Sequence, residues 1–157
     1  MKIRLICIGK TGKSFLVEGE SEYLSRLKHY SPVDKVEIPD IKNAKNLSRE
    51  QIKLEEGKLI LGKCQPGDRI ILLDEGGKEF SSEKFAEYLQ KQFNIGGKAL
   101  VFVVGGAYGF SEEVEGRADG KLSLSKMTYS HQMVRMIFLE QLYRANTILR
   151  SEPYHHS

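Results

Sequence analysis

The chain has 157 residues, of which 40% are apolar and 29% charged, and its 24 Lys and Arg against 21 Asp and Glu leave a formal net charge of +3. This composition predicts one globular domain over residues 1–157 and excludes the disordered and collagen-like classes. No apolar run approaches the roughly 20 residues that span a bilayer, and no secretory signal is visible, so we expect a cytoplasmic protein. Cys7 and Cys64 have no metal or redox spacing, so we expect reduced thiols and no bound metal.

The first half of the chain alternates short aliphatic runs with amphipathic segments, which is the pattern of an α/β domain. We predict, in chain order, a strand over 3–8, a helix over 16–27, a strand over 33–38, a helix over 48–60 and a strand over 69–74. Ser48 and Gln51 have the spacing of a capping box at the start of the second helix. Leu59 is expected on the buried face of that helix, and Gly76-Gly77 is expected to separate the third strand from the next helix.

The second half continues the same alternation. We predict a helix capped by Ser81 or Ser82 and running to 93, a strand over 99–104, a short helix from 111, a strand over 121–125 and a long helix over 131–150. The strand over 99–104 has no polar residue, as expected of a strand that is buried on both faces of a sheet. The buried stripe of the last helix is predicted to comprise Val134, Ile137, Phe138, Leu142, Ala145 and Ile148.

A glycine loop over 104–109 follows the most apolar strand, at the position where open α/β sheets bind ligands. Its pattern is not Gly-x-Gly-x-x-Gly, and Glu112 and Glu113 open the next helix. Two carboxylates in a first helical turn would repel a pyrophosphate, so we do not expect a dinucleotide or phosphate-loop site. The loop either forms a plain tight turn or lets the backbone approach a flat, uncharged group.

Residues suited to anion and proton chemistry cluster near the last helix. Small polar residues over 123–128 either cap that helix or contact a ligand. His131 and Arg135 are one turn apart on one face, at a helix end that attracts anions or is merely solvated. Tyr143 and Arg144 pair an aromatic ring with a guanidinium, which either stacks on a base or covers the core.

The chain ends in Glu-Pro-Tyr-His-His-Ser over 152–157, a segment that would ordinarily fray. Two adjacent histidines without further ligands do not make a metal site.

Several motifs are distributed over the whole length of the chain. They are Lys-Ile-x-Leu-x-x-x-Gly-Lys over 2–10, Glu22-Tyr23, Val-Gly-Gly-x-x-Gly over 104–109, Leu-Ser-Lys-Met-Thr-Tyr-Ser-His-Gln-Met-Val-Arg over 124–135, Glu-Gln-Leu-Tyr-Arg-Ala over 140–145, and Tyr154-His155. With these motifs the chain resembles the bacterial 23S ribosomal RNA pseudouridine N3-methyltransferase family of the SPOUT superfamily. His156 departs from the family pattern, which commonly has Lys or Arg after the terminal Tyr-His.

The resemblance implies a single SPOUT-type α/β domain, with a mostly parallel sheet flanked by helices and a C-terminal trefoil knot that builds an S-adenosylmethionine pocket. By position, it implies that the cofactor is bound by Leu73, Gly105, Leu124, Ser125, Lys126, Met127, Thr128 and Tyr129. It also implies that a homodimer, which binds its substrate across the interface, methylates N3 of pseudouridine 1915 in 23S rRNA of the assembled ribosome.

Methylation at N3 requires that the imide proton leave. His155 or His131 could accept this proton or stabilise the imide anion, and we expect Tyr154 and Arg144 in the same catalytic group. Arg135, Tyr143 and His156 are expected to contact the RNA. Two other functions remain open from the residues, namely a ribosome-binding factor without catalysis and a transfer RNA methyltransferase of the same superfamily.

Overall fold

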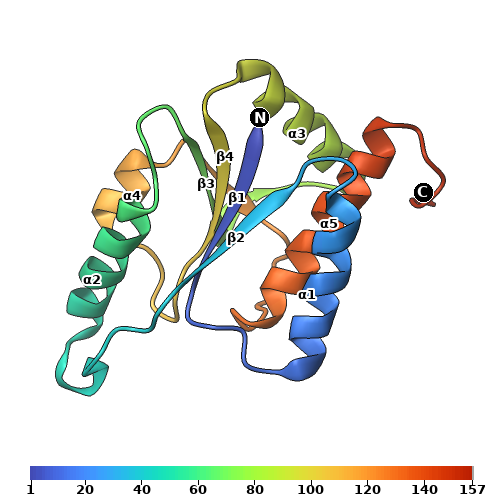
Figure 1. The fold of residues 1–157 in the computed structure, drawn as a ribbon. Coiled ribbons are helices and arrows are strands. Elements are labelled where there is room, and N and C mark those ends of the chain that lie inside the picture. The colour runs from blue at the N-terminus through green and yellow to red at the C-terminus, as the bar shows by residue number, and fades with distance from the viewer. Residues whose placement is uncertain (157) are drawn as a thin grey trace.

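The structure is a computed structural model that describes residues 1–156. Its central layer is a parallel sheet of five strands in the order β2-β1-β4-β3-β5 (Figure 1). The strands are β1 (Lys2–Ile8), β2 (Val33–Ile38), β3 (Arg69–Glu79), β4 (Ala99–Val104) and β5 (Gly120–Ser123). The helices are α1 (Ser14–Leu27), α2 (Arg49–Gly62), α3 (Ser82–Ile95), α4 (Glu112–Arg117) and α5 (Met133–Leu149), with a short 3-10 turn η1 at Ala44–Asn46. The α/β class with a parallel sheet is therefore confirmed.

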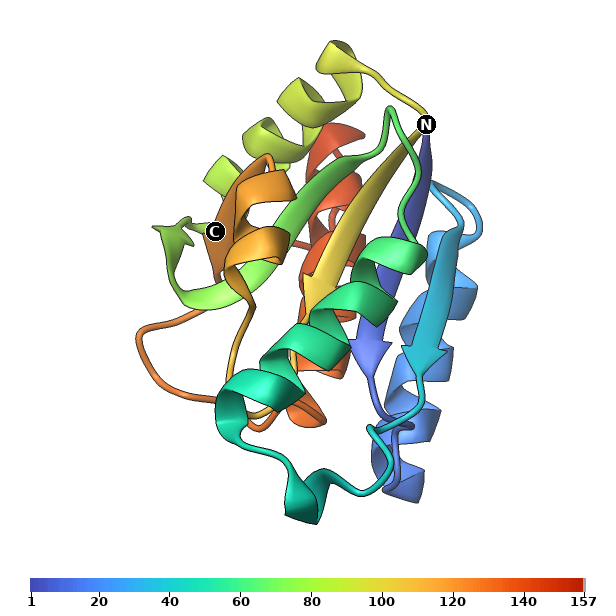
Figure 2. The ribbon, with the colours of Figure 1, turned by 90° about the vertical axis from the view of Figure 1, so that its left-hand side faces the viewer.

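Helices cover both faces of the sheet. Figures 1 and 2 show α1, α3 and α5 on one face and α2 and α4 on the other. The central strand β4 contributes to both cores, because Leu100 and Phe102 pack toward Phe138 of α5 while Val101 and Val103 pack in the cluster on the opposite face. All six residues of β4 are buried, as its apolar sequence predicts. No helix over residues 1–156 is long and apolar enough to cross a membrane.

The capping box at the start of α2 is present. The Gln51 backbone N–H donates to Ser48 Oγ at 3.1 Å, and the Ser48 N–H donates to Gln51 Oε1 at 2.8 Å. The expectation for Leu59 is wrong, because its side chain is 43% exposed while Ile60 beside it is buried. Only the stripe of α2 that includes Ile60 faces the sheet, and Leu59 lies outside it.

Strand β3 is longer than predicted. It continues past Gly76-Gly77 to Glu79, and the bulge between Leu73 and Lys78 lets both of these residues pair with Leu122 of β5. A Cβ at Gly77 would lie 2.7 Å from the Leu122 backbone nitrogen. The glycine therefore permits a close approach of two strands rather than ending one of them.

Helix α5 begins at Met133, two residues later than predicted. The Gln132 side chain accepts from the Gly12 N–H at 2.9 Å and donates to the Lys10 carbonyl at 3.1 Å. Residues 131–132 consequently form a turn that is tied to the loop after β1. His131 lies before the helix and does not share a helical face with Arg135.

Candidate active site at the carboxyl ends of the central strands

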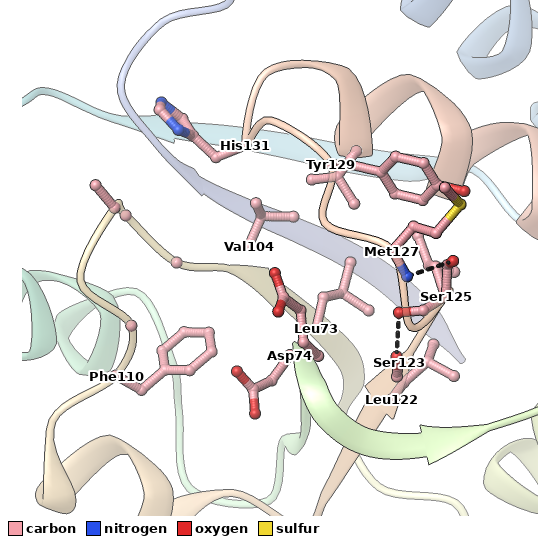
Figure 3. A pocket seen from close by; sticks show the side chains of 17 residues that line it. Leu73, Asp74, Val104, Phe110, Leu122, Ser123, Ser125, Met127, Tyr129 and His131 are labelled. Carbon is pink, nitrogen blue, oxygen red and sulfur yellow. Dashed lines mark hydrogen bonds between the residues drawn. The ribbon is translucent and has the colours of Figure 1, made fainter.

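A cavity of about 240 Å³ opens where β3, β4 and β5 end (Figure 3). The carboxyl edge of a parallel sheet is the usual ligand site in open α/β folds. The cavity is lined by Leu73, Asp74, Glu75, Val104, Gly105, Gly106, Ala107, Gly109, Phe110, Leu122, Ser123, Leu124, Ser125, Met127, Tyr129, His131 and Val134. Its walls thus come from the end of β3, the glycine loop after β4, and the loop between β5 and α5.

The glycine loop shapes one wall through close packing at Gly105. A Cβ at this position would lie 2.9 Å from a ring carbon of Phe110, which itself lines the cavity. Gly105 therefore allows the backbone and the Phe110 ring to occupy adjacent space. The approach of this loop to a flat ligand stays a prediction, because the contact at Gly105 is with a ring of the same chain.

The loop between β5 and α5 is held by its own serines. Ser123 Oγ donates to the Ser125 carbonyl at 2.9 Å, and Ser125 Oγ accepts from the Met127 N–H at 2.9 Å (Figure 3). Ser130 is the residue that caps α5, because its Oγ accepts from the Met133 N–H at 3.0 Å. Ser123 and Ser125 are therefore not helix caps, and they fix the backbone that encloses the cavity.

The structure brings most of the predicted cofactor residues to this cavity. Those that line it are Leu73, Gly105, Leu124, Ser125, Met127 and Tyr129. Lys126 and Thr128 alternate with them along the loop and are exposed, and neither lines the cavity. If these two residues contact a ligand, they do so from outside the wall.

Sequence reasoning missed the carboxylates of Asp74 and Glu75, which line the cavity directly after the buried part of β3. Their position at the end of an apolar strand was the available signal, because parallel strands present their carboxyl ends to ligands. The negative charge they bring favours a ligand with a cationic centre. It disfavours a pyrophosphate, in agreement with the interpretation of the glycine loop.

His131 lies at the mouth of the cavity. It is exposed and lines the cavity from the turn before α5 (Figure 3). The Arg135 Nε donates to the His131 carbonyl at 3.0 Å, and this hydrogen bond fixes the backbone of His131. An exposed imidazole on a fixed turn can exchange a proton with a bound substrate.

The expectation that Arg135 contacts RNA is wrong. Its side chain is fully buried, and its guanidinium donates to the carbonyls of Ile8 and Gly9 at 2.6 and 2.8 Å and to Thr11 Oγ1 at 3.0 Å. Glu37 lies 3.7 Å from it and balances its charge. Arg135 therefore joins α5 to the loop after β1, and its buried guanidinium is out of reach of a phosphate.

We expect Arg135→Ala to lower the free energy of unfolding by about 3–5 kcal/mol, because it breaks a buried ion pair with Glu37 and leaves the carbonyls of Ile8 and Gly9 without this donor. Urea denaturation measures this loss. Arg150→Ala is the matched control. Arg150 directly follows α5 and is exposed, so its loss should cost well under about 1 kcal/mol. A fully stable Arg135→Ala protein with weakened RNA binding would restore the original expectation.

Tyr143 does not present a free face to a base, contrary to expectation. Its ring lies 4.7 Å from that of Tyr154, 5.7 Å from that of Tyr30 and 6.1 Å from that of Tyr23, between centroids. The Arg26 guanidinium lies 5.4 Å from the same ring. This aromatic cluster covers the outer side of α1 and α5, where the burial of ring area stabilises the fold.

Arg144 is engaged within the chain rather than with a phosphate. Its Nε donates to Glu140 at 2.9 and 3.3 Å, and its guanidinium lies 4.8 Å from the Tyr154 ring. The Glu140 carboxylate balances its charge. Arg144 consequently holds the terminal segment against α5, beside the Tyr154 and His155 with which it was expected to act.

The terminal segment over 152–156 is docked, so it is not the frayed end that a short polar tail would ordinarily form. Tyr30 Oη donates to Glu152, and burial, followed by hydrogen bonding to Tyr23, raises the pKa of Tyr154 to about 12. The Tyr154 phenol therefore stays protonated at neutral pH, so it can form hydrogen bonds or stack but does not act as a phenolate base. Neither Tyr154 nor His155 lines the cavity of its own chain.

The His155 ring has both nitrogens engaged. Arg144 can only donate, so the 3.0 Å contact of its guanidinium with Nδ1 makes that nitrogen the acceptor. The proton then lies on Nε2, which donates to Glu83 at 2.7 Å and holds the pKa of Glu83 below its usual range. For His155 to accept a substrate proton, the ring must leave Arg144 or Glu83.

His156 is exposed at the end of the described chain and remains available to a partner.

Comparison with known proteins places these features in one family. Residues 1–155 match the family model described as "Predicted SPOUT methyltransferase". The chain is 60% identical to "Ribosomal RNA large subunit methyltransferase H" of Parabacteroides distasonis and 59% identical to the protein of that name from Christiangramia forsetii, over 99% of this chain and of each relative. It is similar in fold to "a probable methylase family protein" from Haemophilus influenzae, with a TM-score of 0.52 and 13% identity over 99% of this chain and 70% of the other. The chain therefore belongs to the SPOUT methyltransferase family.

Proposed function

We propose that this protein transfers a methyl group from S-adenosylmethionine to N3 of pseudouridine 1915 in 23S rRNA of the assembled ribosome, acting in the cytoplasm as a homodimer. The observation that carries the proposal is the identity of about 60% over the full length with relatives named ribosomal RNA large subunit methyltransferase H. The cavity at the carboxyl edge of the sheet supports it, because the motifs shared with the family build its walls. The C-terminal knot implied by the resemblance stays a prediction.

The residues of the cavity fit S-adenosylmethionine. Leu73, Leu124 and Phe110 offer apolar surface to a flat purine, and Gly105 lets the Phe110 ring pack against the loop. Asp74 brings a negative charge that suits a cationic methyl donor. When bound, S-adenosylmethionine supplies an electrophilic methyl group, so the remaining task of the chain is to position the acceptor and to move one proton.

The proton at N3 of the substrate must leave before the nitrogen lone pair can react. Within the same chain, His131 is the candidate proton acceptor. It is exposed at the mouth of the cavity and can accept the proton on a ring nitrogen. His155 is the candidate from a second chain, where it would accept the proton or donate a hydrogen bond to the imide anion. In the second case the Arg144 contact breaks as the substrate binds.

A homodimer is supported by the apolar rim of the cavity. Met127 and Tyr129 line the cavity and are 75% and 37% exposed, and Met133, at the start of α5, is 38% exposed. Exposed apolar side chains that surround a polar site are typical of surfaces that another protein covers. A second copy docked on this rim would bring a terminal segment to a cavity that its own segment does not reach.

The test is methyl transfer with purified components. Isothermal calorimetry should give stoichiometric binding of S-adenosylmethionine, and labelled methyl groups should enter assembled ribosomes but not transfer RNA. Ribosome binding without cofactor binding would instead indicate a non-catalytic ribosome-binding factor. Incorporation into transfer RNA alone would assign the protein to a different branch of the superfamily.

A further inference from the structure

A second cavity, of about 350 Å³, lies behind the glycine loop. It extends between the end of β1 at Ile8, helix α2 at Ile52 and Glu56, and the loop at Tyr108. We call it the Glu56 cavity. It shares Gly106, Ala107 and His131 with the cavity described above, so the two spaces adjoin along these residues.

The Glu56 carboxyl group is buried beside this cavity and has an unsatisfied oxygen. The side chain is only 8% exposed, and its buried Oε1 has no hydrogen-bond partner among the described residues. Burial, followed by the nearby charge of Asp40, raises its pKa. Buried polar atoms are nearly always satisfied in native proteins, so an orphaned acceptor that lines a cavity indicates a ligand that supplies an N–H or O–H.

The glycine loop is built around this carboxyl group. A Cβ at Gly106 would lie 2.6 Å from Glu56 Oε2 and 2.7 Å from Oε1. Only glycine lets the loop pass this close to the carboxylate. Glu56 therefore packs against a residue that lines both cavities.

The other sides of the Glu56 cavity suit a nucleobase on an RNA strand. Ile8 and Ile52 provide apolar surface for the faces of a flat ring, and Tyr108 adds an aromatic one. The Arg49 guanidinium lies 5.1 Å from the Tyr108 ring, and Lys45 lines the cavity together with Asp40, so two cations and one carboxylate stand at its edge, and the cations can contact a phosphate. The combination of apolar faces, outer cations and a buried acceptor fits a base flipped out of its strand.

We propose that Glu56 accepts the N1–H of the target pseudouridine and thereby selects this nucleoside over uridine. Pseudouridine is joined to ribose through carbon, so its ring carries free N–H groups at both N1 and N3. Uridine uses N1 for the glycosidic bond and has no such donor. A site built to bind a substrate N–H rejects the analogue that lacks it, because its buried acceptor is then left unpaired.

This proposal rests on the proposed function and adds the residue that determines its specificity. It also accounts for the position of His131, which lines both cavities and would face the N3 side of a base held by Glu56. The carboxylate reads one edge of the base, while the imidazole serves the nitrogen that becomes methylated.

The test compares Glu56→Met and Glu56→Gln with wild type on two ribosome substrates, one with pseudouridine at the target and one from a strain that leaves uridine there. Glu55→Gln is the matched control, because Glu55 is the exposed neighbour on α2. For Glu56→Met we expect kcat/KM on pseudouridine ribosomes to fall roughly 10- to 100-fold, the loss of a hydrogen bond to a charged group, with uridine ribosomes unaffected. Glu56→Gln keeps an uncharged acceptor, so its kcat/KM on pseudouridine ribosomes should lie between those of Glu56→Met and wild type.

Two readouts besides turnover exclude a merely structural effect. Affinity for pseudouridine ribosomes without methyl donor should fall with the same preference, while calorimetric affinity for S-adenosylmethionine and the thermal midpoint should not fall. Variants that keep the wild-type preference, or that lose both substrates equally, would overturn the role of Glu56, as would a wild type with no preference. A wild type inactive on both ribosomes would overturn the proposed function, and the role of Glu56 with it.

Discussion

Gly105→Val should abolish measurable S-adenosylmethionine binding while leaving the chain folded. A Cβ at Gly105 would already lie 2.9 Å from the Phe110 ring, and the two valine methyl groups need still more space. The ring can yield only by moving within a cavity it lines, so the volume is lost to the cofactor. Calorimetry should show at least a hundredfold loss of affinity, the order expected when a well-packed site is filled.

Gly12→Val is the control for this substitution. A Cβ at Gly12 meets nothing within 4 Å, and its backbone is not in the left-handed region. We expect cofactor affinity to be unchanged in this variant. Circular dichroism should confirm that both proteins keep their helices. Equal affinity of Gly105→Val and wild type would contradict the assignment of the cavity to the cofactor.

Removal of residues 154–157 should lower methyl transfer by roughly 10²–10⁴-fold, as expected for the loss of a general acid–base group. Cofactor binding and dimerisation should persist, because the terminal segment does not line the cavity and packs on the outer side of α5. His155→Ala should reproduce most of the loss, whereas His29→Ala, at an exposed histidine on the loop after α1, should have no effect. His156→Arg should keep or raise activity if that position supplies only a basic contact.

A mixed dimer determines whether the segment acts on its own chain or on its partner. Chains with Gly105→Val cannot bind the cofactor but keep the terminal segment, and truncated chains have the reverse defect. If the segment acts across the dimer, mixing the two inactive proteins restores methyl transfer, because one site per mixed dimer is complete. Failure to recover activity in verified mixed dimers would place the segment's action within its own chain. Full activity of the truncated protein would show that the segment is dispensable.

Local sequence patterns predicted the elements whose burial is set by their own residues. β4 has no polar residue and is buried throughout, and the Ser48–Gln51 pair forms the capping box its spacing indicates. The loop between β5 and α5 was predicted to bind the cofactor from the resemblance of its motif to a known family, and not from hydrophobic periodicity. Its serines alone did not distinguish a helix cap from a ligand contact, because both roles use the same hydroxyl chemistry.

Contacts between segments that are distant in the sequence account for the predictions that were wrong. Arg135 has a cationic side chain near a helix start and was expected in solvent, but its partners at Ile8 and Gly9 lie more than 120 residues away in sequence. Gly77 was expected to break a strand, yet its role depends on how closely β5 approaches. Glu56 gave no local signal either, since only the folded glycine loop isolates its carboxyl group from donors.

The most direct test of the account is mass spectrometry of 23S rRNA from cells that lack this gene. The fragment that contains pseudouridine 1915 should be lighter by one CH2 unit, because a hydrogen replaces the methyl group, and the wild-type gene, but not Gly105→Val, should restore that mass. An unchanged methyl group at this nucleoside in the deletion strain would contradict the proposed function.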